Sequence, residues 1–322
     1  MKRANNLFDR IAARDNLELA FYRAKRGKEW KQEVSAFRAE LDQELEMLGR
    51  CIQDNTVEVG HYHYFRIRDP KERVICAASF RERVLHHAIM AVCDDAFEKY
   101  QIHDSYASRK GKGVDACLGR TMEFCRIYRW YLKLDIHKFF DSIDHAILLN
   151  LLNRRFKDQR LLYLFSRIIE SYETDKGKGV PIGNLTSQYF ANLYLGLMDH
   201  RIKDQWRVPG YLRYMDDFLL FSDDRGALLQ WLDTIGVLLR DELKLELNEP
   251  IINRTLAGIP FLSYIVHGDH MRLSLKARRR FRRKIARADE LENPNMALPL
   301  LAFINRADSY AFRKKLLGES SI

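Results

Sequence analysis

The sequence lacks the features of several protein classes. Its five cysteines, Cys51, Cys76, Cys93, Cys117 and Cys125, are scattered and contain no Cys-x-x-Cys pair. This spacing argues against a structural zinc site and a disulfide framework, and it fits a reducing compartment. No apolar run reaches the length of a membrane span, and no signal peptide is visible. We therefore expect a cytoplasmic protein with no membrane partner.

The sequence also contains no internal repeat, no low-complexity linker and no Gly-x-x-x-x-Gly-Lys-Ser/Thr phosphate loop. Its 322 residues can bury a large core, and this length suggests about two domains. The net charge of +10 and the pI near 9.3 favour a polyanionic partner, because each neutralised phosphate releases counterions. Since many basic proteins bind no nucleic acid, the charge alone does not identify that partner.

Two adjacent carboxylates, Asp216 and Asp217, lie between apolar runs in residues 212–221. This pattern predicts a buried β-hairpin whose tight turn carries the charge. A buried unpaired carboxylate is costly, so it takes up a proton or finds a cation such as a divalent metal. Asp-Asp also occurs at 94–95 and 223–224, and an exposed turn explains the dipeptide equally well. The dipeptide by itself therefore does not indicate catalysis.

A second acidic segment lies upstream. Residues 131–134 predict a short buried strand that ends at Asp135. Phosphoryl transfer through two divalent ions about 4 Å apart needs acids from at least two segments of a chain. Asp135 and Asp216 can supply them.

These two segments together resemble the palm of a reverse transcriptase. The shared features are Tyr-Met-Asp-Asp at 214–217 in a hairpin and an upstream aspartate-bearing strand with an aromatic residue five positions after the aspartate. The resemblance implies an α+β protein with the right-hand polymerase architecture of fingers, palm and helical thumb, in which an antiparallel palm sheet carries the catalytic β-hairpin.

A third segment narrows the resemblance. Ile-Gly-Asn-Leu-Thr-Ser-Gln at 182–188 is similar to reverse transcriptases of diversity-generating retroelements and to related bacterial enzymes of the retron and group II intron type. Most other reverse transcriptases have Gln-Gly in place of Ile182-Gly183 and Ser-Pro in place of Ser187-Gln188. The similarity extends from about Leu17 to about Leu317.

The resemblance implies four regions. Residues 1–55 form an N-terminal helical extension and 56–130 form the fingers. Residues 131–265 form the palm, with an insertion at 150–180 and a primer-grip hairpin at 255–268. Residues 266–322 form the thumb.

The resemblance also implies the catalytic groups. Asp135, Asp216 and Asp217 are expected to be catalytic, and the same three residues with Ile136 are expected to bind metal. The expected cofactor is a pair of Mg²⁺ ions, with Mn²⁺ as a substitute. One ion activates the primer 3′-hydroxyl and the other stabilises the leaving pyrophosphate.

A basic, glycine-containing loop over 104–114 precedes a predicted helix. Loop cations and a helix N-terminus both attract phosphate, although a solvated turn is an equally good explanation of the loop alone. In the resembled family this loop closes over the triphosphate of the incoming nucleotide. That role would fall to Arg109 and Lys110, with Lys112 beside them.

Other nucleotide contacts follow from the resemblance. Phe140 is at the position of the steric gate that favours dNTP over NTP, and Phe139 would be the gate only if the register slipped. Ile182, Gly183 and Gln188 would lie under the templating pair. Ile182 replaces a glutamine that holds the nucleotide in most relatives. Losing one polar contact lowers discrimination by about 1 to 3 kcal/mol, roughly 10- to 200-fold, which suits an error-prone enzyme.

Nucleic-acid contacts are expected on the fingers helix, the catalytic hairpin, the primer-grip hairpin and the thumb. The thumb helix, over 276–287, is strongly basic and carries an apolar edge, a pattern that fits a duplex backbone. The residues expected to make these contacts are Arg81, Arg83, Tyr214, Met215, Phe261, Leu262, Arg279 and Arg283. Residues 298–317 are expected to complete the thumb.

Periodicity predicts the remaining elements. Helices are expected over 5–53, 80–100, 115–128 and 227–243. Alternating apolar residues that begin at Val57 and Val59 predict a β-hairpin over 56–78, with its turn at 69–71. Ser142 or Asp144 is expected to cap the helix that begins near His145.

Two positions depart from the resembled family. Relatives usually carry Pro-x-Lys after the strand that follows the catalytic hairpin, and that lysine protonates pyrophosphate. This chain has Glu249-Pro250-Ile251 and no matching lysine, and Arg254 is too basic to donate a proton. The proton donor therefore stays open. Ser263 stands where relatives commonly have glycine in the primer grip.

The sequence thus predicts an RNA-directed DNA polymerase that makes cDNA from a dedicated structured noncoding RNA, in error-prone synthesis by a diversity-generating retroelement. Its expected partners are an RNA template, the RNA/DNA duplex, dNTPs and that RNA, and the family also allows an accessory protein. Three alternatives stay open: a defence polymerase copying its own noncoding RNA, an inactive RNA-binding scaffold, and a template-independent nucleotidyltransferase.

Overall fold

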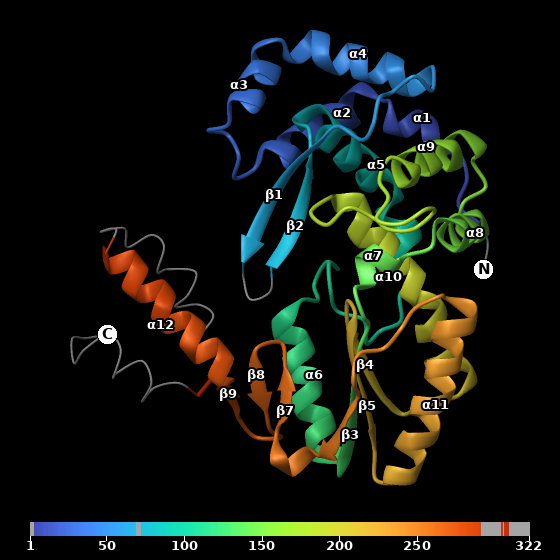
Figure 1. Cartoon of the computed structure of the whole chain (residues 1–322). Coiled ribbons are helices and arrows are strands. Elements are labelled where there is room, and N and C mark those ends of the chain that lie inside the picture. Colours follow the sequence, from blue (N-terminus) through green and yellow to red (C-terminus); the bar gives the residue numbers. More distant parts are fainter. Residues whose placement is uncertain (1–2, 69–71, 291–303, 305, 309–322) are drawn as a thin grey trace. The chain divides into compact units, whose positions relative to one another are not determined.

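The computed structural model describes residues 3–68, 72–290, 304 and 306–308 (Figure 1). The chain divides into two compact units. The helical unit comprises Met1–His103, Ile136–Gln205 and Gly236–Glu246, and the sheet unit comprises Asp104–Asp135, Trp206–Ile235 and Leu247–Ile322. The expected boundaries of fingers, palm and thumb stay predictions.

The helical unit is built around α5, a largely buried helix against which α2 and α10 pack. Its core is aromatic, and the Phe97 ring lies 5.2 Å from Phe156 and 5.4 Å from Tyr189. Its helices are α1 (Phe8–Ile11), α2 (Arg14–Lys25), α3 (Gln32–Ala39), α4 (Leu41–Gln53), α5 (Phe80–Glu98), α7 (Phe139–Ser142), α8 (His145–Arg155), α9 (Gln159–Glu170) and α10 (Leu185–His200), which a π turn (Arg201–Gln205) continues. Asp144 caps α8 by accepting the Ile147 N–H at 3.0 Å. Of the two caps expected, Ser142 and Asp144, the structure therefore has Asp144.

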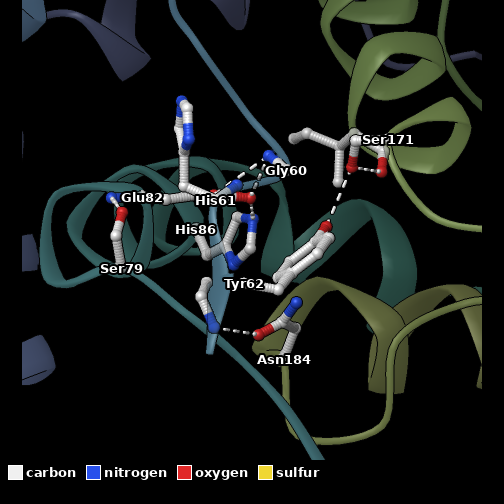
Figure 2. Close-up of polar contacts among 10 residues, drawn as sticks. Gly60, His61, Tyr62, Ser79, Glu82, His86, Ser171 and Asn184 are labelled. Atoms are coloured by element: carbon white, nitrogen blue, oxygen red, sulfur yellow. Dashed lines mark hydrogen bonds and ion pairs between the residues drawn. The ribbon is translucent and has the colours of Figure 1, made fainter. Parts of the chain in front are cut away.

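The hairpin of the helical unit is shorter than expected. Strands β1 (Tyr62–Arg68) and β2 (Glu72–Ala78) pair in antiparallel register, but Val57 and Val59 precede the strand in irregular backbone, so the prediction of a strand there was wrong. Gly60 has φ +94°, and the Glu82 side chain accepts its N–H at 3.1 Å and that of His61 at 3.2 Å (Figure 2). The backbone at Gly60 and His61 therefore bonds to α5 instead of to a neighbouring strand. The turn expected at 69–71 lies outside the described residues.

Glu82 also lies beside a buried histidine (Figure 2). His86 Nε2 is 3.6 Å from Glu82 Oε1 and makes no hydrogen bond. Burial, together with the charges of His87 and Arg83, lowers the pKa of His86 to about 3. Burial raises the pKa of Glu82, against the two backbone amides that favour its carboxylate. The His86 ring is therefore neutral in the folded protein.

The sheet unit holds two antiparallel sheets (Figure 1). The larger has the strand order β4-β5-β3-β6, and the smaller has the order β7-β8-β9. The strands are β3 (Trp130–Asp135), β4 (Gly210–Tyr214), β5 (Asp217–Ser222), β6 (Ile251–Arg254), β7 (Ile259–Phe261), β8 (Tyr264–Val266) and β9 (Met271–Leu273). Apolar residues of both sheets, of α6 (Val114–Ile127) and of α12 (Leu275–Glu290) form one core. Helix α11 (Arg225–Glu242) belongs to both units.

The described elements confirm the α+β prediction, the hairpin that carries Asp216 and Asp217, and the expected helices, whose ends shift by a few residues. In the turn of the β7–β8 hairpin, Leu262 and Ser263 have φ of +47° and +78°. Glycine adopts such angles most easily, which accounts for its common occurrence in relatives at the position of Ser263. The rest of the expected thumb, residues 298–317, lies outside the described residues except at 304 and 306–308. Among the helices that the structure describes, none combines the length and apolarity that a membrane crossing requires.

Candidate active site

The carboxylates are brought together by strand register. Asp135, the last residue of β3, lies directly opposite Asp217, the first residue of β5. Tyr214 also pairs with Asp217, so Met215 and Asp216 form a two-residue turn. Met215 has φ +57°, a left-handed conformation typical of tight hairpin turns. The three aspartates predicted from the sequence therefore lie at one end of the sheet.

The Asp217 carboxylate is largely enclosed. Its side chain is 21% exposed, and Oδ2 lies 3.1 Å from Lys133 Nζ. Its Oδ1 is buried without a hydrogen-bond partner. Burial is the main cause of a rise in the pKa of Asp217 to about 7, to which Asp135 and Asp216 contribute and which Lys133 opposes. An orphaned acidic oxygen of this kind is suited to a cation.

Lys133 was missed in the sequence. It lies two residues before Asp135 and therefore on the same face of β3. Its ammonium group contacts Asp217 and donates to the Pro260 carbonyl oxygen at 3.0 Å. Lys133 thus compensates the carboxylate and links the two sheets. The only sequence signal was the Lys-Leu-Asp alternation at 133–135.

Asn248 was missed as well. Its side-chain amide donates to Asp135 Oδ2 at 2.6 Å, and its backbone N–H donates to the Asp135 carbonyl oxygen at 2.8 Å. This two-point contact fixes both the backbone and the carboxylate of Asp135. One carboxylate oxygen stays available for another ligand.

Arg213 is the third residue that the sequence did not reveal. It is fully buried in β4, where its guanidinium donates to the Met215 carbonyl oxygen at 3.0 Å and to Ser105 Oγ at 3.3 Å. The backbone of Arg213 pairs with Asp104 and Tyr106 through hydrogen bonds of 2.9 Å. Arg213 therefore holds the turn that presents Asp216. Its position in an otherwise apolar strand was the available signal.

The aspartates fit a divalent ion. No three His, Cys, Asp or Glu side chains in the described ranges form a ready-made metal cluster. Mg²⁺ differs from metals held in closed protein cages, because it typically takes one or two carboxylates and fills its octahedron with water and substrate phosphate. Asp135, Asp216 and the unpartnered oxygen of Asp217 supply hard oxygen donors of that type.

The basic loop of the sheet unit has a defined backbone. Ser108, Gly111 and Gly113 have φ of +55°, +72° and +105°, and Gly113 precedes α6, which has no side-chain cap. Arg109 donates to the Ser105 carbonyl oxygen at 2.6 Å, whereas Lys110 is exposed. Lys112 Nζ lies 5.1 Å from the centre of the Tyr106 ring. Triphosphate contacts by these three cations stay a prediction.

The remaining residues expected to contact the nucleotide belong to the helical unit. Phe139 is buried and Phe140 is half-buried, and the steric-gate role of Phe140 stays a prediction. Ile182, also half-buried, is fixed by its carbonyl oxygen, which accepts the Cys76 N–H at 2.9 Å. Gly183 has φ +116°, and a Cβ there would lie 2.9 Å from Ile75 Cγ2, so only glycine fits. Gln188 is half-buried in the first turn of α10.

The residues expected to contact nucleic acid differ in exposure. Arg81 lies 3.8 Å from Glu44, and Arg83 donates to the Ala24 carbonyl oxygen at 3.0 Å, so both arginines contact their own unit. Arg279 and Arg283 are exposed on α12. Tyr214 and Met215 are half-buried, Phe261 is buried, and Leu262 packs partly against the core. These roles stay predictions.

Comparison with known proteins adds independent information. The family model described as "Reverse transcriptase (RNA-dependent DNA polymerase)" matches residues 67–262, more than half of the chain. The group II intron-encoded protein LtrA of Lactococcus lactis subsp. cremoris is 23% identical over 296 residues, covering 69% of this chain and 49% of LtrA. The protein YkfC of Escherichia coli K12 is 24% identical over 241 residues, covering 59% of this chain and 63% of YkfC.

Among solved structures, apo telomerase from Candida tropicalis has a TM-score of 0.51 at 12% identity, covering 67% of this chain and 49% of the telomerase chain. At that identity the likeness concerns the fold alone. The chain spans less than two thirds of the length of each of these three proteins.

Proposed function

Because the chain belongs to the reverse transcriptase family, we propose that it is an RNA-directed DNA polymerase that uses two-metal phosphoryl transfer. The observation that carries the proposal is the pairing of Asp135 with Asp217 across neighbouring strands, beside a turn that carries Asp216. Two acidic segments at one sheet end meet the requirement of a two-ion site.

In this proposal Asp135 and Asp216 hold two Mg²⁺ ions, for which Mn²⁺ can substitute. Bound ions activate the primer 3′-hydroxyl and stabilise the departing pyrophosphate. Asn248 orients Asp135, Arg213 positions the turn under Asp216, and Lys133 favours the ionised form of Asp217. Arg109, Lys110 and Lys112 receive the triphosphate, and Phe140 excludes a 2′-hydroxyl. Arg81, Arg83, Arg279 and Arg283 contact the nucleic acid.

The biological role proposed is error-prone cDNA synthesis from a dedicated structured RNA in a diversity-generating retroelement. Ile182 supports it, because the hydrogen bond from Cys76 fixes an aliphatic residue where a polar contact would select the correct nucleotide. Loss of that contact corresponds to roughly 10- to 200-fold weaker discrimination.

The test is to purify the protein with its co-expressed RNA, add Mg²⁺ and dNTPs, and sequence the DNA that forms. Products copied from a neighbouring RNA with errors concentrated at adenines would support the retroelement role. Faithful or repetitive copies would favour the defence polymerase, and products that form without template would favour a nucleotidyltransferase.

Asp216→Asn is the control for catalysis. It should lower the rate by orders of magnitude and leave RNA affinity nearly unchanged. If Asp216→Asn and the unaltered protein give the same products, or if neither gives any, the chain is a binding scaffold and the proposed chemistry is wrong.

A further inference from the structure

The sheet unit carries a second concave surface at the opposite end of β3 from Asp135. It is a cavity of about 640 Å³, and it lies around Trp130, the first residue of β3. Three arginines line it, Arg126, Arg129 and Arg254, together with one acid, Asp223. Because β3 rises about 3.3 Å per residue, roughly 16 Å of strand separate Trp130 from Asp135. The cavity is therefore distinct from the carboxylate site.

Two exposed apolar side chains border this cavity. Leu256 is 88% exposed and Ile127 is 59% exposed. Leu256 lies on a short 3-10 turn, Thr255–Ala257, which hydrogen bonds hold in place. Thr255 is buried, its hydroxyl donates to the Tyr128 carbonyl oxygen at 2.7 Å, and its N–H donates to the Arg129 carbonyl oxygen at 2.9 Å. A leucine held out to solvent on a fixed turn is the arrangement of an interface anchor.

The arginines are positioned for an acidic partner. Arg254 lies over the Trp130 ring, with its guanidinium carbon 5.2 Å from the ring centre. The Asp223 carboxylate accepts the Arg129 backbone N–H at 3.0 Å, so the one acid of the cavity is directed to the backbone. Arginine and tryptophan beside apolar residues are the composition typical of protein interfaces.

The neighbouring strand offers backbone groups as well. β6 pairs with β3 on one side and with no other strand among those that the structure describes. Because the Thr255 N–H bonds to Arg129, alternate residues of the ladder bond to β3, and the backbone groups of Ile252 and Arg254 point to the free edge. The Arg254 N–H is covered by its neighbour, Asn253 Oδ1, at 2.8 Å. A free edge of this kind accepts an added strand.

We infer that this surface, made of the β6 edge, Leu256, Ile127 and the three arginines, binds an extended acidic segment of a partner protein that carries apolar side chains. The partner adds as a strand along β6, its carboxylates meet the arginines, and an apolar side chain packs on Leu256. The inference does not depend on the proposed polymerase activity.

The test uses the full chain and a fluorescent peptide in which glutamate alternates with valine, measured by fluorescence anisotropy. Binding should weaken at least tenfold in Leu256→Ser and several-fold, with a smaller salt dependence, in Arg129→Gln. Asn253→Ala frees an edge amide and should strengthen binding. Leu229→Ser removes another exposed leucine of the sheet unit and should leave the affinity unchanged.

Three results would overturn the inference. The first is no binding of the glutamate peptide, and the second is equal binding of a peptide in which lysine alternates with valine. The third is an RNA oligonucleotide that binds instead and loses affinity in the same variants, which would make the surface a nucleic-acid site. A peptide with N-methylated alternate amides tests strand addition, because it should bind at least tenfold more weakly.

Discussion

The buried arginine behind the catalytic turn offers the sharpest test of how the site is held. Arg213→Met places an unbranched apolar side chain in β4 and removes the hydrogen bonds to the Met215 carbonyl oxygen and to Ser105 Oγ. Hydrogen bonds from a charged donor contribute about 1.5 to 3 kcal/mol each. We expect the free energy of unfolding to fall by about 3 to 6 kcal/mol, the sum of two such bonds.

The catalytic effect should exceed the effect on substrate binding. Met215 has φ +57°, and without the guanidinium its turn can relax and move Asp216. A displacement of about 1 Å lowers rates about a hundredfold. Single-turnover primer extension on a fixed template-primer should show that loss in the rate constant, with little change in the KM for dNTP.

Arg213→Lys is the matched control. It retains a charge but presents one ammonium group where two bonds are made, so its rate and stability should fall between those of Arg213→Met and the unaltered protein. The reasoning is refuted if Arg213→Met folds with unchanged stability and extends primers at the normal rate.

Three further predictions concern other positions. Lys133→Met should leave Asp217 without its cation and lower the unfolding free energy by about 1 to 3 kcal/mol, measured by urea denaturation, since Asp217, whose pKa is raised to about 7, then takes up a proton; an unchanged midpoint would contradict this role. Ile182→Gln should raise discrimination against mispaired nucleotides at least tenfold in a misincorporation assay, and equal error rates would argue against a role for this residue in fidelity. His86 is neutral when folded but protonates below its ordinary pKa of 6.5 when unfolded, so the folded state loses stability as the pH falls. At pH 5 the unfolding free energy should have fallen by about 2 kcal/mol more than in His86→Leu. The raised pKa of Glu82 stabilises the folded state as the pH falls, but this effect is present in both proteins and cancels in the comparison. The measurement is urea denaturation across this pH range, and parallel pH profiles of the two proteins would contradict the prediction.

The catalytic hairpin could be predicted because its information is local. Apolar runs around two acids specify two strands and a tight turn, and the strand before Asp135 has the same signature. The sheet then places Asp135 opposite Asp217. The residues that stabilise the site could not be found in this way. Asn248 is 113 residues from Asp135, and Lys133 is 127 residues from Pro260, so no periodicity joins the partners.

The error at Val57 and Val59 has the same origin. Their alternation is typical of a strand, but the backbone amides of Gly60 and His61 bond to Glu82, which belongs to a helix more than twenty residues away. A buried carboxylate that accepts several amides outweighs a local β preference.

The register of β3 against β5 limits how the length of this chain can change. Side chains alternate between the two faces of a strand, so one residue inserted or deleted within Trp130–Asp135 or Asp217–Ser222 would turn every following side chain to the other face. Asp135 and Asp217 would then no longer lie on the same face of the sheet. In related chains we therefore expect insertions and deletions to fall outside these two strands, for example before β3 and after β5, while the strands keep their lengths even where their apolar residues are exchanged.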